Sequence, residues 1–287
     1  RKGLLDGKKG KETGMKAIRA VIIVIFLAAV GIYGLAEYQE MANADPNRPQ
    51  LVSETERIVV PCDYTEEDIM EGLSAHDEED GDLTGEILLG GLSRFTTPGI
   101  CRATYVVFDS ANQSAVLTRE VEFEDYRSPR FTLSAPLVFL EGASGDAISN
   151  VGAEDVLDGD ISAQVRMTAN DISYLRTGEY TMTVEVSNSF GDYADAVLPV
   201  HVVNSDSQAL SLDLETNLLY LEQGSAFSPD GYVTAVRLED GSEAVGVQVT
   251  AQSDVDPSVP GYYEVEYTAE DEEGRTGVTW MIVIVEE

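Results

Sequence analysis

The sequence predicts an all-β protein of three tandem β-sandwiches that follow an apolar N-terminal segment. Three observations support this: an acidic phrase that recurs along the chain, a strand-like alternation after each copy, and frequent turn signals between short apolar runs. Because the repeat is about 80 residues long, each copy is a small domain rather than one unit of a solenoid.

The acidic phrase has the form Ala-x-Asp-x-x-Asp-Gly-Asp-aliphatic-hydroxyl and begins at Ala75 and Ala153. A degraded third copy begins at Ala235, with Arg237 and Ser242 where the first two copies have aspartate. A second phrase, which starts with a glycine, follows each copy. These glycines, Gly99, Gly178 and Gly261, are 79 and 83 residues apart.

Each leading glycine opens a run in which apolar residues alternate with period two, as in a half-buried strand. The three runs are 101–107, 180–186 and 263–269. A turn and a final apolar strand follow each run, and we expect the final strands at 115–123, 194–203 and 277–285. About seven short strands per unit, with turns every eight to twelve residues, are typical of a β-sandwich.

The expected organisation has six parts, which are a cytoplasmic basic segment (1–19), a transmembrane anchor or signal-peptide core (20–36), a linker (37–55), and repeats at 56–126, 127–206 and 207–287. Residues 20–36 carry no charge, and seven of the 18 basic residues precede them. Because basic residues stay inside, we expect the C-terminal domains to be extracytoplasmic. A single-pass protein of a bacterial cell membrane is the first interpretation, and a secreted protein is the alternative.

The exported part is strongly acidic. From residue 37 onward there are 11 arginines, no lysine and 50 acidic residues. Such a surface repels nucleic acid and attracts divalent cations. We therefore expect no nucleic-acid partner, and Ca²⁺ is the only cofactor that the sequence indicates.

Two interpretations of the acidic phrases stay open. Three aspartates within six residues around a glycine could converge on Ca²⁺, but Asp-Gly is also a favoured turn whose carboxylates bind local backbone N–H groups. The candidate metal residues are Asp77, Asp80, Asp82, Asp155, Asp158 and Asp160. The third copy is not expected to bind a cation, because Arg237 would occupy its place.

Two cysteines, Cys62 and Cys101, lie in the first repeat. Export would permit a disulfide between them, and two separate buried thiols are the alternative. The sequence contains no nucleophile elbow, zinc-binding His-Glu-x-x-His or phosphate loop, so we expect no enzyme activity. His201 alternates with apolar residues on a final strand and is interpreted as a strand-face residue.

The Ala-x-Asp-x-x-Asp-Gly-Asp phrase, the Gly-x-Tyr at Tyr180 and Tyr263, and the Asp-x-x-Gly or Asn turns together resemble bacterial immunoglobulin-like domains, related to hyalin and cadherin-like repeats. The resemblance covers about residues 56–287 and is weaker in the third repeat. It implies tandem immunoglobulin-like sandwiches at a cell surface and a tyrosine corner in repeats two and three.

The resemblance fixes no ligand. We expect a non-enzymatic adhesion, interaction or spacer module with a protein or glycan partner at the cell envelope. A carbohydrate- or cell-wall-binding module and an accessory subunit of a membrane enzyme are the alternatives. The third repeat is expected to be the working end, so that deletion of 208–287 would remove binding and leave the other two repeats folded.

Overall fold

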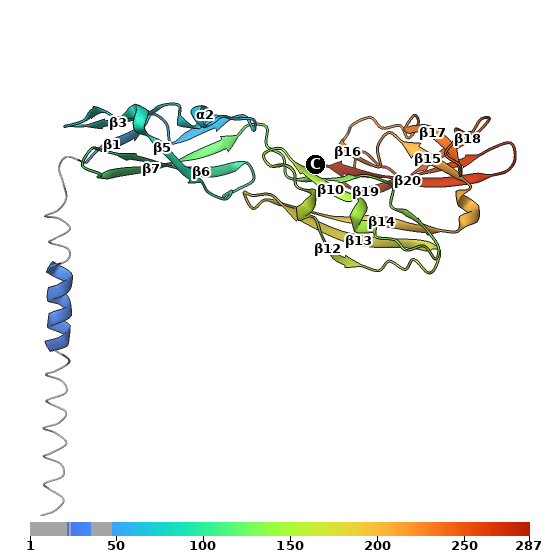
Figure 1. Ribbon diagram of the computed structural model, residues 1–287, viewed down its shortest axis with the longest axis horizontal. Coiled ribbons are helices and arrows are strands. Elements are labelled where there is room, and N and C mark those ends of the chain that lie inside the picture. Colours follow the sequence, from blue (N-terminus) through green and yellow to red (C-terminus); the bar gives the residue numbers. More distant parts are fainter. Residues whose placement is uncertain (1–21, 23, 36–47) are drawn as a thin grey trace, which may run out of the picture. The chain divides into compact units, whose positions relative to one another are not determined.

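The computed structural model describes residues 22, 24–35 and 48–287 (Figure 1). Residues 22 and 24–35 are helical and expose apolar side chains. Within these described ranges, no helix is both long enough and apolar enough to span a membrane. The predicted basic segment, the other positions of the predicted anchor, and linker positions 37–47 lie outside the described residues.

The rest of the chain is built of short strands, as predicted. The first repeat contains β1 (Gln50–Ser53), β2 (Arg57–Val60), α2 (Glu66–Met70), β3 (Leu73–Asp77), β4 (Gly81–Asp82), the 3₁₀ helix η1 (Thr84–Glu86), β5 (Leu88–Leu92), β6 (Ile100–Phe108) and β7 (Ser114–Phe123). The second contains β8 (Arg130–Leu133), β9 (Val138–Leu140), η2 (Ala147–Asn150), β10 (Val151–Asp155), β11 (Gly159–Asp160), η3 (Ser162–Gln164), β12 (Arg166–Asn170), β13 (Gly178–Ser187) and β14 (Tyr193–Val203). The third contains η4 (Ser205–Gln208), β15 (Leu210–Leu214), β16 (Leu218–Glu222), β17 (Val233–Leu238), β18 (Gln248–Ser253), β19 (Gly261–Glu270) and β20 (Thr276–Glu286).

Each repeat has two sheets, which confirms the all-β prediction. The strand orders are β1-β3-β4 and β2-β7-β6-β5, then β11-β10-β8 and β12-β13-β14-β9, then β15-β17 and β16-β20-β19-β18. The three alternating strands expected from the sequence are β6, β13 and β19 (Figure 1). The three expected final strands are β7, β14 and β20, each of which is the neighbour of one alternating strand in its sheet.

The chain forms two compact units. The first combines the described residues up to Val52 with Leu73–Leu88 and Val106–Leu117, and the second combines Ser53–Gly72, Leu89–Tyr105 and Thr118–Glu287. The domain boundaries expected at residues 56, 127 and 207 stay predictions.

The first unit corrects the predicted linker. Gln50–Ser53 lie inside the linker expected at 37–55, yet they form β1 at the edge of the β3 sheet. The neighbouring Pro46 and Pro49 favoured a linker. Leu51 is half-buried, and this apolar side chain is a reason for the segment to join the sheet.

Two hydrophobic cores lie in the second unit. One holds buried residues of both sheets of the second repeat, among them Phe131, Ala153 and Leu198. The other holds buried residues of both sheets of the third repeat, among them Leu212 and Tyr267. Side chains from two facing sheets therefore fill each core, as in a β-sandwich.

Strand β20 contributes to both cores. Its residues from Met281 to Val285 are all buried, so neither face of this stretch meets solvent. Met281 and Val283 belong to the core of the third repeat, whereas Ile282 and Ile284 belong to the core of the second. Successive side chains of a strand point to opposite faces, which lets one strand complete two cores.

This shared core overturns one expectation. Deleting residues 208–287 would remove Leu218, Ile282 and Ile284 from the cluster that holds the second repeat together. The structure therefore argues against the expectation that the second repeat stays folded after this deletion, because its core would be opened to water.

The tyrosine corners are confirmed. The Tyr180 hydroxyl donates to the Arg176 carbonyl at 3.0 Å, and the Tyr263 hydroxyl donates to the Val259 carbonyl at 2.9 Å. A second tyrosine anchor was not anticipated. Tyr105 and Tyr267 donate at 2.7 Å to carbonyls 36 and 38 residues earlier in the chain, and so tie the strand to a distant loop.

Arg119 is an unexpected core residue of the first repeat. It is only 3% exposed and stands where the other repeats have the buried Leu198 and Met281. Its guanidinium donates to the Ile69 carbonyl, to the Tyr105 hydroxyl at 3.1 Å and to the Ser53 hydroxyl at 3.1 Å. These acceptors compensate the lost hydration of a buried cation.

The shared core predicts that one substitution on the outer face of β20, the face turned away from the core of the third repeat, strongly lowers the free energy of unfolding. Ile282→Ala should lower the free energy of unfolding by about 2–5 kcal/mol, as for any fully buried isoleucine, because the side chain fills the neighbouring core. Denaturant unfolding of the full chain measures it. Gln252→Ala, at an exposed position of β18, should stay within about 0.5 kcal/mol of the parent. Equal, small effects of both changes would contradict the shared core.

Candidate functional site: the repeated acid loops

The first acid loop lies between β3 and β4 and is closed by its own aspartates. Asp77 Oδ1 accepts hydrogen bonds from the backbone N–H groups of Glu79, at 2.8 Å, and Asp80, at 3.0 Å. Asp82 Oδ1 accepts from Thr84 N at 2.9 Å. Gly81 has a positive φ of 76°, which glycine adopts without strain. Local turn chemistry therefore uses two of the three predicted ligands.

The second acid loop, between β10 and β11, repeats this pattern. Asp155 Oδ1 accepts from Leu157 N at 2.9 Å and Asp158 N at 3.0 Å, and Asp160 Oδ1 accepts from Ser162 N at 2.9 Å. The same acidic phrase thus produces the same hydrogen bonds in both repeats.

The middle aspartate of each loop holds the turn that follows the long strand. Asp80 Oδ2 accepts from Ser110 N at 2.7 Å. In the second repeat, Asp158 Oδ2 accepts from Ser189 N at 2.6 Å and Asp158 Oδ1 from the Ser189 hydroxyl at 2.8 Å. The acid loop is therefore a clamp that joins two distant turns of its repeat.

The structure brings the three aspartates of each phrase into one loop, but it does not gather them around a common point. Within residues 22, 24–35 and 48–287, no group of three or more Asp, Glu, His or Cys side chains is placed to hold a metal ion. Calcium at the six predicted positions stays a prediction, and the observed hydrogen bonds are those of the turn interpretation.

The degraded third loop is held by ion pairs. Arg237 Nε donates to Asp213 Oδ2 at 2.6 Å. Asp271, in the turn after β19, is paired with Arg275 at 2.6 Å and accepts from Glu273 N at 3.0 Å. Guanidinium groups of arginine thus pair with the aspartates Asp213 and Asp271 in this repeat.

The link between the first two repeats is an aromatic cluster within the second unit. The rings of Phe95 and Phe190 are stacked with centroids 4.7 Å apart, and Phe95 N donates to the Phe190 carbonyl at 2.9 Å. Phe123 and Tyr126 pack edge-on against these rings. The Tyr126 hydroxyl donates to Asp192 at 2.6 Å, and burial raises the pKa of this tyrosine well above its ordinary value.

Sequence reasoning missed this cluster. Its one visible signal is Phe190, an aromatic residue in a turn where the first and third repeats have only small or polar residues.

The link between the second and third repeats is polar and aromatic. His201 is buried, stacks on Trp280 with ring centroids 3.8 Å apart, and lies 2.8 Å from Glu264. Arg130 forms an ion pair with Glu286 and lies over the Tyr220 ring. His201 is therefore a strand-face residue, as predicted, and Arg130 pairs with an acidic residue at a joint.

Both cysteines are free thiols in the structure, with Cys101 buried and Cys62 half-buried. The disulfide between Cys62 and Cys101 stays a prediction. Burial raises the pKa of Cys62 to about 12, helped by the nearby Asp125 carboxylate, and burial raises the pKa of Cys101 to about 11. Thiols with such pKa values are protonated, and so unreactive, at neutral pH.

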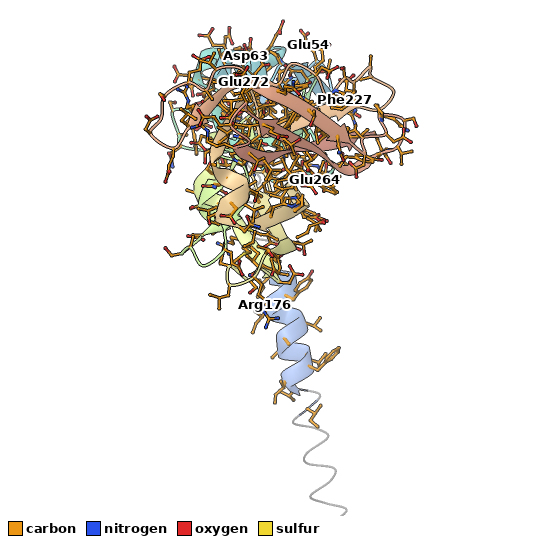
Figure 2. All side chains as sticks on the ribbon, turned by 90° about the vertical axis from the view of Figure 1, so that its right-hand side faces the viewer. Glu54, Asp63, Arg176, Phe227, Glu264 and Glu272 are labelled. Atoms are coloured by element: carbon orange, nitrogen blue, oxygen red, sulfur yellow. The ribbon has the colours of Figure 1, made fainter. Side chains whose placement is uncertain are left out.

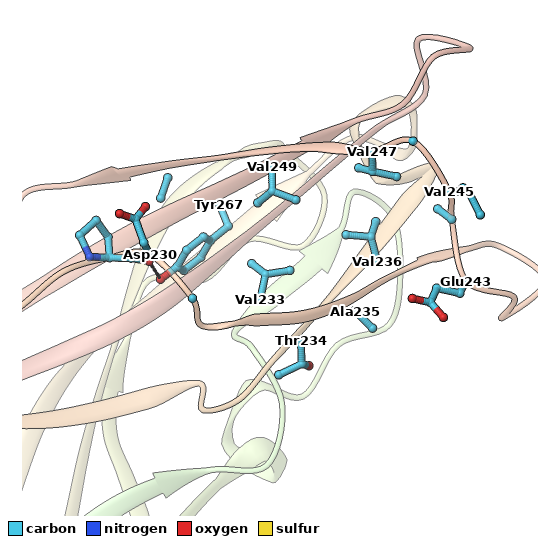
Figure 3. Close-up of a pocket in the computed structure, with 15 residues that line it drawn as sticks. Asp230, Val233, Thr234, Ala235, Val236, Glu243, Val245, Val247, Val249 and Tyr267 are labelled. Carbon is cyan, nitrogen blue, oxygen red and sulfur yellow. Dashed lines mark hydrogen bonds between the residues drawn. The ribbon is translucent and has the colours of Figure 1, made fainter.

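The third repeat has a groove of about 550 Å³ between the edge strands of its two sheets. Val233 and Val236 of β17 face Val247 and Val249 across it, and the Tyr267 ring closes one end (Figure 3). Neither β17 nor β18 has a second strand as neighbour. The groove is thus apolar inside and bordered by two sheet edges. The outer edge of β18 has no strand neighbour, whereas β17 is bridged at Arg237 by Glu243, and Ala244 N donates to the Val236 carbonyl at 2.8 Å.

Comparison with known proteins supports the predicted resemblance. Residues 214–285 match the family described as "Bacterial surface protein, Ig-like domain". The match falls on the third repeat, where the acidic phrase is most degraded, and confirms a bacterial Ig-like surface domain there.

Two curated relatives are similar over longer stretches. The chain is 29% identical over 226 residues to the pesticidal crystal protein Cry22Aa of Bacillus thuringiensis, covering 74% of this chain and 29% of that protein. It is 26% identical over 144 residues to an uncharacterized 81.3 kDa protein of Acholeplasma phage L2, covering 49% of this chain and 19% of that protein. The chain spans less than a third of either relative's length.

Solved structures with some likeness are remote. One holds the CBM51-2 and INT domains of Clostridium perfringens ZmpB in complex with GlcNAc, at 16% identity and a TM-score of 0.23, covering 49% of this chain and 28% of that one. Another is the protocadherin GammaB4 extracellular domain, at 13% identity and a TM-score of 0.20, covering 85% and 50%. Likeness of this degree bears on neither ligand nor partner here.

The state of the cysteines predicts a labelling result. Iodoacetamide at pH 8 should modify neither Cys62 nor Cys101 in the native chain, because burial keeps both thiols protonated. In denaturant without reductant both should become labelled, which mass spectrometry counts directly. No labelled thiol after unfolding would instead establish a disulfide.

Proposed function

We propose that this chain is a non-enzymatic interaction module of a bacterial cell surface, exported and tethered by its N-terminal apolar segment. The family match over residues 214–285 supports the surface assignment. The uncharged stretch at 20–36 behind seven basic residues supports export and tethering. Adhesion or protein contact is the proposed role, and the first two repeats act as a spacer for the third.

The groove of the third repeat is the observation that carries the binding proposal. Val245 is 88% exposed and Val249 is 41% exposed beside the groove, so apolar surface stays in contact with water. Such surface marks interaction sites in soluble proteins. The adjoining outer edge of β18, which has no strand neighbour, suits an extended segment that adds a strand and places alternate side chains in the groove.

Charge defines the proposed occupant. Asp230 and Glu243 line the groove, and the chain carries a formal net charge of −34. Many oxygen-tipped side chains project outward from the ribbon (Figure 2). A second copy of so acidic a chain would be repelled. The fitting partner is an extended, basic peptide segment of another protein with alternating apolar side chains.

A peptide array tests this proposal. The full chain should bind decamers in which apolar residues alternate with lysine or arginine, and binding should weaken as salt rises. Val249→Asp should lower this binding about tenfold or more, because it places a carboxylate in the apolar groove. Val116→Asp, at a similarly exposed valine of β7 in the first repeat, is the matched control and should bind like the parent.

The outcomes also separate the alternatives. Binding on a glycan array without any bound peptide would replace the proposal with a carbohydrate- or cell-wall-binding module. Co-purification with one membrane enzyme, unaffected by Val249→Asp, would favour an accessory subunit. Equal loss of binding in both aspartate variants would show that the groove is not the contact surface.

A further inference from the structure

The first acid loop contains a buried carboxylate oxygen with no protein partner. Asp77 is only 3% exposed, and its Oδ1 atom binds two backbone N–H groups. Its Oδ2 atom is the one buried side-chain nitrogen or oxygen without a hydrogen-bond partner in the described part of the chain. A buried charged oxygen without a partner is costly, so this position calls for a compensating group.

The second repeat shows where that group should lie. Asp155 is equivalent to Asp77, and Asp155 Oδ2 accepts a hydrogen bond from Asn188 Nδ2 at 3.1 Å. Asn188 is the tenth residue after its leading glycine, and in the first repeat that position is Asp109. The amide that satisfies the carboxylate in one repeat is therefore replaced by a second carboxylate in the other.

Hydrogen bonds show that these two turns have the same geometry. Asp109 N donates to the Gln113 carbonyl and Asn188 N to the Asp192 carbonyl, both at 3.0 Å. Asp109 Oδ1 accepts from Gln113 N at 2.7 Å, and Asn188 Oδ1 accepts from Asp192 N at 2.9 Å.

Each turn is also fixed to its acid loop through the following serine. With Oδ1 placed alike, the second oxygen of Asp109 stands where Asn188 carries its amide nitrogen. In the second repeat, the group at that position binds the carboxylate oxygen equivalent to Asp77 Oδ2.

We infer that the first repeat binds one divalent cation between the carboxylates of Asp77 and Asp109. Five acidic residues between positions 77 and 82, against three between 155 and 160, add to the negative potential at this loop. The second repeat needs no ion because Asn188 takes its place. The third needs none because Arg275 pairs with Asp271, the residue equivalent to Asp109. The inference does not depend on the proposed peptide binding.

The ligand set indicates calcium and modest affinity. Carboxylate oxygens are hard ligands, and Ca²⁺ accepts irregular coordination completed by water, whereas Mg²⁺ demands near-ideal octahedral geometry. No third acidic, histidine or cysteine side chain among the described residues completes the site. We therefore expect a dissociation constant of about 10⁻⁴–10⁻³ M, the range of extracellular calcium modules.

Calcium titration of the full chain, followed by calorimetry and by thermal unfolding, tests the inference. The parent should bind one Ca²⁺ per chain, and its Tm should rise with calcium. Asp109→Asn should weaken binding about tenfold or more, and in EDTA it should unfold at a higher temperature than the parent, because the amide replaces one of two facing carboxylates. Asp82→Asn removes the same charge from an exposed position of the same loop and should keep the binding.

Any of four results would overturn the inference. The first three are the absence of a saturable calcium site in the parent, unchanged calcium binding in Asp109→Asn, and an equal loss of calcium binding in both variants, which would indicate diffuse attraction to acidic surface. A fourth is a Tm that rises on acidification but not with calcium, since a proton shared by the two carboxyls would then fill the position. Peptide binding can fail without affecting any of these readouts.

Discussion

The first two repeats each depend on an aspartate that is buried at the end of one strand and needs a partner from the turn after another strand. Asp155 accepts from the amide of Asn188. In the third repeat the equivalent position is Arg237, and the turn residue Asp271 pairs with Arg275 of its own turn. Asp77 has equivalent backbone bonds, but its second oxygen has no hydrogen-bond partner. The clamp between acid loop and turn is therefore constant in backbone geometry and variable in charge. Similar sandwiches therefore differ in whether their buried carboxylate has a partner within the protein. In the first repeat it has none, and the loop becomes a candidate ion site.

The second constraint is the double use of β20. Because Ile282 and Ile284 fill the core of the second repeat while Met281 and Val283 fill that of the third, the second repeat does not have a complete core alone. Small sandwiches bury modest cores, and sharing one strand increases the apolar area that each removes from water. The joint residues His201, Trp280 and Glu264 extend this contact. Surface left for partners is thereby concentrated at the open edge of the third repeat, where the apolar groove lies.

Local patterns predicted much of this architecture. Period-two alternation located the long strands, Gly-x-Tyr located the corner bonds of Tyr180 and Tyr263, and Asp-Gly located the turns. Contacts between distant residues were not predictable. The run from Met281 to Val285 is uniformly apolar, and such a run does not reveal which second core its outer face fills. The pairing of Asp155 with Asn188 joins residues 33 positions apart. Only the folded chain shows that the aspartates bind backbone N–H groups first, so that one buried oxygen, on Asp77, is left unsatisfied.

The most direct test replaces Asn188, the partner of Asp155 in the second repeat. Asn188→Asp converts the second repeat to the arrangement of the first. In EDTA it should lower the Tm of the full chain, because two carboxylates then face each other, and calcium should restore most of the loss by occupying the new site. A loss of Tm that calcium does not restore, or no loss at all, would contradict the claim that an amide and a cation are alternative partners of one buried carboxylate.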